Sequence, residues 1–283
     1  MILKVALTIA LSQAVRSKVD DRDPLSACLW WPENTQLQLK FSADGNPVTP
    51  GDTEFIAIAA AMNTWQTQMN RCSSLTLSQG AHTGTRKVGF FEKETNENIA
   101  VFRLRRCSDV VPQGTTCGDD CGNQFDCWQH QEAAIAITTT SYNPTTGRIL
   151  DSDIEFNAPT FTFSTVDSPV CPGGSVSTSC VAIDLQNTTT HELGHLLGLG
   201  HSPSTSSTMS FRANQGELSK RVLDADTAQF VCDVYPRGRP SQACSVKPVS
   251  KQLGAAVKGC TAAPGGVLIA IAVLLLRRRR SSR

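Results

Sequence analysis

The sequence lacks an excess of either charge. Its 26 lysines and arginines nearly balance its 25 aspartates and glutamates, which leaves a formal net charge of +1. Five arginines lie within the last seven residues, so the rest of the chain carries −4. A protein that binds nucleic acid needs a basic face. The balance therefore argues against a nucleic-acid partner.

The sequence also lacks internal repeats, heptads and a long apolar run. The most apolar stretch near the C-terminus, residues 267–276, precedes four arginines at 277–280. Even with Gly265 and Gly266 included, it would rise only about 18 Å as a helix, whereas the hydrocarbon core of a bilayer is about 30 Å thick. We therefore do not expect a comfortable membrane span. A marginal anchor whose arginines stay in the cytoplasm is the alternative.

Histidine is scarce, and three of the five histidines fall within eleven residues. The stretch reads His191-Glu192-Leu193-Gly194-His195-Leu196-Leu197-Gly198-Leu199-Gly200-His201. Residues four apart share a helical face, so His191 and His195 can reach one ion. Gly198 lets the chain leave the helix and bring in His201 as a third ligand. Three protein ligands leave a fourth position for water, as in catalytic zinc sites.

Glu192 lies beside the first ligand, where its carboxylate can touch a metal-activated water. Zinc polarises a scissile carbonyl and acidifies the water, and Glu192 is the predicted general base that later delivers the proton to the leaving amine. The alternative, surface histidines on an amphipathic helix, requires a chance match at all of the specified positions. His82 and His130 have no such context, and we interpret them as ordinary polar residues.

The eleven-residue stretch resembles the long zinc signature of metzincins, and Met209 lies where their Met-turn lies. The chain is most similar to the matrixins, because Ser202 follows the third histidine and Phe211 stands where other metzincins carry an extra tyrosine ligand. Residues 147–157, residues 223–236 and the opening Trp31-Pro32 also resemble matrixin-like bacterial proteases. The similarity covers residues 28–236.

The resemblance implies an α+β fold with a twisted, mostly parallel five-stranded sheet, one antiparallel edge strand, two long helices before the zinc site and one after it. The edge strand, residues 133–141 with Ile135, Ala136 and Ile137, would bind extended substrate by β-addition. Met209 would form a hydrophobic floor beneath a single catalytic Zn²⁺. A matrixin-type cysteine switch sequence is missing, so we do not expect latency by that route.

Hydrophobic patterns predict the elements of such a fold. Short apolar or alternating stretches are typical of strands, and they occur at residues 36–41, 75–77, 87–91, 99–104, 133–140 and 149–156. Longer patterns predict helices over residues 52–68, 181–197 and 223–234, the second ending at Gly198. Asp119, Asp120, Asp126, Asp151 and Asp153 are candidate ligands of Ca²⁺, with ordinary exposed loop carboxylates as the alternative.

Eleven cysteines are many for a chain of this length. Ten lie between Cys28 and Cys244, and Cys260 stands apart. We predict five structural disulfides in an exported protein, with Cys171 and Cys180 close enough for a local bridge. The alternative is a second metal site, although the spacing does not repeat a C-x2-C pair. Its ligands would be Cys107, Cys117, Cys121 and Cys127.

Both ends of the chain favour export. Residues 1–14 resemble a short signal peptide that ends in Ser12-Gln13-Ala14, with a core strand or a wrongly assigned start codon as alternatives. Residues 260–283 combine Cys260, a small flexible stretch, an apolar run and arginines, and they resemble the sorting tail of myxobacterial surface proteins. Processing near Cys260 by a sorting machinery at the membrane would follow. A catalytic domain at 28–236 and a linker at 237–259 complete the predicted organisation.

The sequence thus predicts a zinc-dependent endopeptidase that hydrolyses extracellular proteins or peptides. We expect a monomer that is secreted or anchored at the bacterial cell surface or outer membrane. One alternative is a catalytically restricted metal-binding surface or adhesion module. Another is a zinc hydrolase that acts on substrates other than peptides, because a fold and a metal do not fix the substrate.

Overall fold

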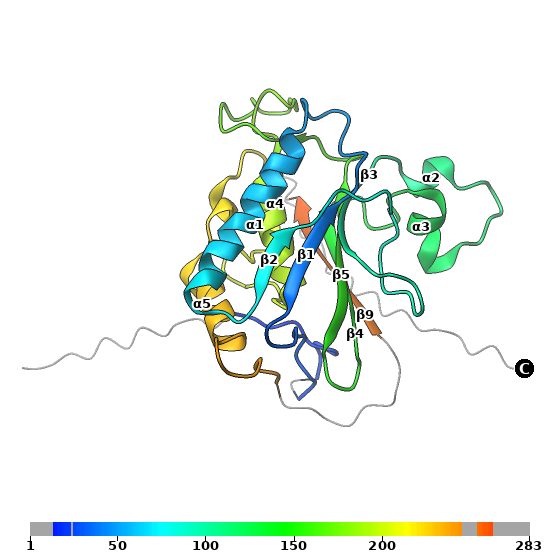
Figure 1. The fold of residues 1–283 in the computed structure, drawn as a ribbon. Helices are drawn as coiled ribbons and strands as arrows, with labels where there is room; N and C mark the ends of the chain where they lie inside the picture. Colours follow the sequence, from blue (N-terminus) through cyan, green and yellow to red (C-terminus); the bar gives the residue numbers. More distant parts are fainter. Residues whose placement is uncertain (1–13, 24, 245–253, 263–283) are drawn as a thin grey trace, which may run out of the picture.

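A twisted mixed sheet forms the centre of the molecule in the computed structural model, which describes residues 14–23, 25–244 and 254–262 (Figure 1). Five strands follow the order β2-β1-β3-β5-β4. Their bounds are β1 Gln36–Phe41, β2 Thr76–Gln79, β3 Asn98–Arg103, β4 Ala134–Tyr142 and β5 Ile149–Asn157. The first four strands in this order are parallel, and β4 runs antiparallel to β5. The predicted five-stranded, mostly parallel sheet is confirmed.

Two further strands extend the sheet beyond β4. Strand β9, Gly254–Ala262, pairs antiparallel with β4, and the two-residue strand β8, Arg212–Ala213, pairs parallel with β9. Figure 1 shows β9 in orange beside β4. Residues 254–262 belong to the predicted linker and tail, where the sequence pattern predicts no strand.

Three long helices lie together on one face of the sheet (Figure 1). They are α1 Thr53–Cys72, α4 Leu185–Leu196 and α5 Ala225–Val234. Their apolar side chains join those of the strands in one core, where Trp65 of α1 and Leu193 of α4 meet Phe41 and Phe156. Helices α1 and α4 precede His201 and α5 follows it, as predicted. No helix in the described part of the chain is long and apolar enough to span a membrane.

Smaller elements connect these layers. The cysteine-rich loop contains α2 Cys107–Val110, the 3-10 turn η1 Gly118–Asp120 and α3 Cys121–Phe125. Strands β6 Phe163–Ser164 and β7 Ile183–Asp184 form a separate two-stranded sheet, and the 3-10 turn η2 Ser219–Arg221 precedes α5.

The strand predicted at residues 87–91 is wrong. The backbone amides of this segment donate to side chains instead of to a neighbouring strand, with N···O distances of 2.9 Å from Val88 to Asn123 and 2.6 Å from Gly89 to Asp153. Phe91 likewise donates to Asn96 at 2.7 Å. Polar side chains that satisfy the backbone remove the need for strand pairing.

The predicted start of the metal-site helix at residue 181 is also wrong. Val181 forms a bridge with Val170, and Ile183 belongs to β7. Helix α4 begins at Leu185 because the carboxylate of Asp184 accepts the amide of Asn187 at 2.7 Å and so caps the first turn.

Five disulfides confirm the pairing of ten cysteines. They join Cys28 to Cys244, Cys72 to Cys232, Cys107 to Cys127, Cys117 to Cys121, and Cys171 to Cys180. The local bridge expected between Cys171 and Cys180 is among them. The alternative second metal site is wrong, because all four of its cysteines are bonded in pairs.

Some predicted features fall beyond what the structure describes. Residues 1–13 of the predicted signal peptide and residues 263–283 of the predicted sorting tail lie outside the described residues, as do linker positions 245–253. Cys260 lies within β9.

Candidate active site

The histidines of the eleven-residue stretch converge on one point. His191 and His195 lie one turn apart on α4, and their Nε2 atoms are 3.1 Å apart. The chain then turns at Gly198, whose φ of 93° lies in the left-handed region that favours glycine. This turn brings His201 back, so that its Nε2 lies 3.1 Å from that of His195. We call these three residues the histidine centre.

Backbone carbonyls fix the orientation of two of the rings. Nδ1 of His191 donates to the carbonyl of Thr208 at 2.7 Å, and Nδ1 of His195 donates to that of Leu199 at 2.8 Å. Each bond places the proton on Nδ1 and leaves Nε2 as the ligand atom. The pKa of His191 is well below its usual value, because burial disfavours the charged ring and because His201 and Lys220 are nearby. A neutral imidazole is the form that binds a metal.

The geometry of the histidine centre fits zinc. The three ligand atoms lie within 4.8 Å of one another. Two nitrogen ligands at the usual zinc distance in tetrahedral geometry are about 3.3 Å apart, close to the observed 3.1 Å. Among the described residues, no other group of three or more histidines, cysteines or acidic residues could hold an ion. The three predicted ligands are therefore brought together.

Glu192 is fully buried beside the histidine centre. Its Oε2 accepts a hydrogen bond of 2.7 Å from the hydroxyl of Thr138, which also reaches the Glu192 carbonyl at 3.1 Å. Thr138 belongs to β4, so the sheet itself orients the carboxylate next to the first ligand. Glu192 follows the first of the three histidines on α4, so this buried carboxylate and two of the imidazoles come from one helix.

Met209 packs directly beneath α4. It is 1% exposed, and a Cβ placed on Gly194 would lie 2.3 Å from its Sδ, so the close approach of the methionine to the helix uses the absence of a side chain at residue 194. The turn that carries Met209 is held by Asp224, whose Oδ2 accepts the Thr208 amide at 2.8 Å. The same Thr208 orients His191, so Asp224 supports the centre through the Met209 turn.

An ion pair holds the start of α4. The carboxylate of Asp184 accepts two hydrogen bonds from the Arg221 guanidinium, at 2.8 Å from Nε and 2.5 Å from an Nη atom. Asp184 is buried and also caps the helix. Arg221 thus fixes the Asp184 carboxylate by a two-point charge-assisted contact, and Asp184 in turn caps the helix that carries His191 and His195.

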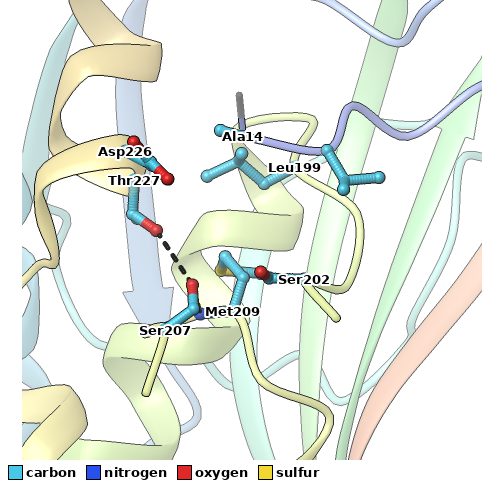
Figure 2. A pocket seen from close by; sticks show the side chains of 8 residues that line it. Ala14, Leu199, Ser202, Ser207, Met209, Asp226 and Thr227 are labelled. Atoms are coloured by element: carbon cyan, nitrogen blue, oxygen red, sulfur yellow. Dashed lines mark hydrogen bonds between the residues drawn. The ribbon is translucent and has the colours of Figure 1, made fainter. Parts of the chain in front are cut away.

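A small pocket lies next to the Met209 turn (Figure 2). Its lining includes Ala14, Leu199, Ser202 and Met209. The segment that starts at Ala14 lies against the loop leading to His201, because the amide of Gly200 donates to the carbonyl of Val15 at 2.8 Å. Ala14 is the last residue of the predicted signal peptide.

The predicted substrate strand lies in β4. Ile135 and Ala136 are fully buried, and Ile137 is nearly so. The outer edge of β4, which the sequence analysis expects to receive substrate, is paired with β9 in this structure. In that pairing Cys260 lies opposite Ala136.

The candidate calcium ligands do not form a cluster among the described residues. Asp126 pairs instead with Arg86 at 2.8 Å and Arg103 at 3.0 Å. Asp153 accepts the amides of Gly89 and Ile99. These carboxylates have protein partners that explain their positions.

Two contributors to the site were missed by sequence reasoning. Thr138 lies within a predicted strand, but nothing in the sequence places its hydroxyl against Glu192. Thr208 acts through its backbone carbonyl, which any residue would supply. Only the neighbouring Met209 gave a signal that this turn approaches the histidine centre.

Comparison with known proteins agrees with this geometry. No curated relative matches the chain. The family model of matrixins, a family of metallopeptidases, matches residues 30–236. This range includes strands β1 to β5, the histidine centre, Glu192 and α5. With most of its length matched to that model, the chain belongs to the matrixin family.

Proposed function

We propose that this protein is a zinc-dependent endopeptidase that hydrolyses peptide bonds of extracellular proteins. The observation that carries the proposal is the convergence of three Nε2 atoms, 3.1 Å from one to the next, beside the fully buried carboxylate of Glu192. Membership of the matrixin family supports a metallopeptidase.

His191, His195 and His201 would hold the metal. Zinc bound there would polarise the scissile carbonyl and lower the pKa of a water molecule. The Glu192 carboxylate would accept a proton from the attacking water, whose oxygen adds to the scissile carbonyl carbon, and would deliver that proton to the amine as the C–N bond breaks. The hydrogen bond from Thr138 holds the Glu192 carboxylate in position for both transfers. Met209 supports the helix from below and does not ligate.

The substrate lies extended along β4. Backbone groups of the strand pair with the backbone of the peptide, so binding tolerates many sequences, while pockets select among side chains. Ile135, Ala136 and Ile137 are the strand residues we assign to this role. Thr138 follows them in β4 and contacts Glu192, so a peptide bound along this strand would pass next to the Glu192 carboxylate.

The test uses the oxidised full-length protein with casein or gelatin. We expect stoichiometric zinc, cleavage of the protein substrate, and loss of cleavage in a chelator. Glu192→Gln should keep the zinc and lose about 10²–10⁴-fold in kcat. Zinc binding without cleavage of any offered protein, or full activity of Glu192→Gln, would contradict the proposal.

We also propose export, with the protein acting as a monomer that is secreted or held at the bacterial surface. Five disulfides support an oxidising compartment, since cytosolic thiols stay reduced. In this proposal a membrane sorting machinery processes the tail near Cys260. Intact-mass analysis of the cell-surface protein tests it, because a chain that still ends in Arg283 would exclude processing.

A further inference from the structure

Strand β9 lies along the edge of the sheet where the proposed substrate would bind. It pairs with β4 from Ala134 to Tyr142, the whole length of that strand. The substrate positions Ala136 and Ile137 lie opposite Cys260 and Gly259. The chain itself therefore supplies the extended peptide that the outer edge of β4 is suited to receive.

The end of β9 is enclosed on both sides. Thr261 lies opposite Ala134 of β4 and also opposite Arg212 of β8. Strand β8 follows Phe211, whose ring centroid is 6.2 Å from that of His201. The backbone of β9 thus enters a slot between the sheet edge and the segment that follows the third histidine.

The same strand passes the proposed base. Lys258 lies opposite Thr138, whose hydroxyl contacts Glu192. Helix α4, which carries Glu192, lies beside β9. Because an edge strand has one outer row of backbone donors and acceptors, β9 and a substrate peptide exclude each other there.

We propose that residues 254–262 are a tethered competitor that occupies the substrate groove and limits access for other peptides. The inference rests on the proposed function. The proposed occupant of the substrate groove is a segment of the chain itself in extended conformation.

The short connection between Cys244 and β9 favours occupation of the groove by β9. The disulfide between Cys28 and Cys244 fixes the chain ten residues before β9 begins at Gly254. A short tether gives an effective concentration of the order of 1 mM. Against a groove affinity of about 100 µM, within the usual range of KM, it would suppress activity about tenfold.

The test weakens β9 within the full-length protein. Successive residues of a strand point their backbone groups to opposite edges, so Ala256→Pro with Val257→Pro removes one amide that faces β4. We expect kcat/KM for an added peptide to rise at least about tenfold, with zinc content unchanged. Ala256→Ser with Val257→Thr keeps both amides and is the matched control, expected to match the unaltered protein.

A second measurement does not depend on activity. In a Glu192→Gln background, which prevents self-cleavage, hydrogen exchange of β4 amides reports the pairing directly. We expect the amides that face β9 to exchange at least about tenfold faster in the proline pair than in the control pair. Equal exchange in both would overturn the inference, whatever the activity.

The two readouts separate the two proposals. Release of the β4 amides with no proteolysis by any variant would support occupation of the groove and contradict the proposed endopeptidase. Proteolysis at equal rates in the proline and control pairs, with equal exchange, would support the endopeptidase and contradict the tethered competitor.

Discussion

Two clusters of polar side chains in this protein differ in how their charges are arranged. The histidine centre brings three like groups together, with the Nε2 atoms of His191 and His201 each 3.1 Å from that of His195. The other, which we call the charged cluster, joins unlike groups on the sheet. It contains Arg86, Arg103, Asp126, His130 and Glu155.

The charged cluster is complete without a ligand. Glu155 accepts Nε of Arg103 at 2.6 Å and lies 3.0 Å from Nε2 of His130. Burial by itself would raise the pKa of Glu155, but Arg103 and His130 outweigh it and lower the pKa to about 2. Opposite charges that neutralise each other make this cluster a structural one.

The contrast separates a structural cluster from a ligand site. In the charged cluster the charges are matched inside the protein, so nothing further is needed. In the histidine centre the outer nitrogens of His191 and His195 are satisfied by backbone carbonyls, and the inner ones all point at one another. Such an arrangement is stable when a cation joins the three nitrogens.

The largest effect should come from the histidine centre. His195→Ala removes the central ligand, so we expect loss of zinc from the purified protein and activity below detection. Zinc content and proteolysis of casein are the measurements. His82→Ala, which alters a ring packed on Phe55, is the control and should keep both. If His195→Ala retained its zinc, the histidine centre would not be the ligand site that distinguishes it from the charged cluster.

The charged cluster should affect stability and not zinc. Glu155→Gln leaves the 1%-exposed guanidinium of Arg103 without its buried partner, and breaking a buried pair costs about 3–5 kcal/mol. Urea unfolding of the oxidised protein measures the loss. Glu132→Gln removes an exposed carboxylate near Arg106 and should cost less than about 1 kcal/mol. Loss of zinc in folded Glu155→Gln would contradict the separation.

Acid titration sharpens the comparison within β5. Burial is the main cause that raises the pKa of Asp151 to about 6. The folded protein therefore holds the proton of the Asp151 carboxyl more tightly than the unfolded chain does. The free energy of unfolding should therefore fall as pH rises from about 4 to 6, by about 2–3 kcal/mol. Glu155 acts in the opposite sense, because its lowered pKa removes stability only as pH falls from about 4.5 towards 2.

Asp151→Asn tests this sign. Burial and the neighbouring Asp151 also raise the pKa of Asp153, so we expect the variant to keep only the part of the decline that Asp153 causes and to be more stable than the unaltered protein at pH 7.5. Asp109→Asn, at an exposed position, should leave the curve unchanged. A decline as large as that of the unaltered protein would show that Asp151 does not contribute to it.

The smallest effect concerns the floor of the histidine centre. Gly194→Ala places a Cβ 2.3 Å from Sδ of Met209, and the flexible thioether should limit the cost to about 1 kcal/mol. In a Met209→Ala background, Gly194→Ala should cost less free energy of unfolding, because the contact between the new Cβ and Sδ is absent. A double-mutant cycle in urea measures it, and additive effects would show that the two residues do not oppose each other.

Prediction from sequence succeeded where spacing along one element decides the outcome. The four-residue separation of His191 and His195, and a glycine at 198, set the ligand geometry almost locally. The alternation in β1 gave its bounds correctly at Gln36–Phe41. It failed at residues 87–91, where amides pair with side chains from distant segments such as Asn123.

The sequence by itself therefore determined the family, the three histidines that could hold a metal and the proposed base, because their spacing lies within eleven residues of one helix and its turn. Tertiary structure alone decided which carboxylates are matched by arginines, how Thr138 holds Glu192, and that residues 254–262 pair with β4. These depend on strand order and register, which bring together residues that local periodicity does not relate.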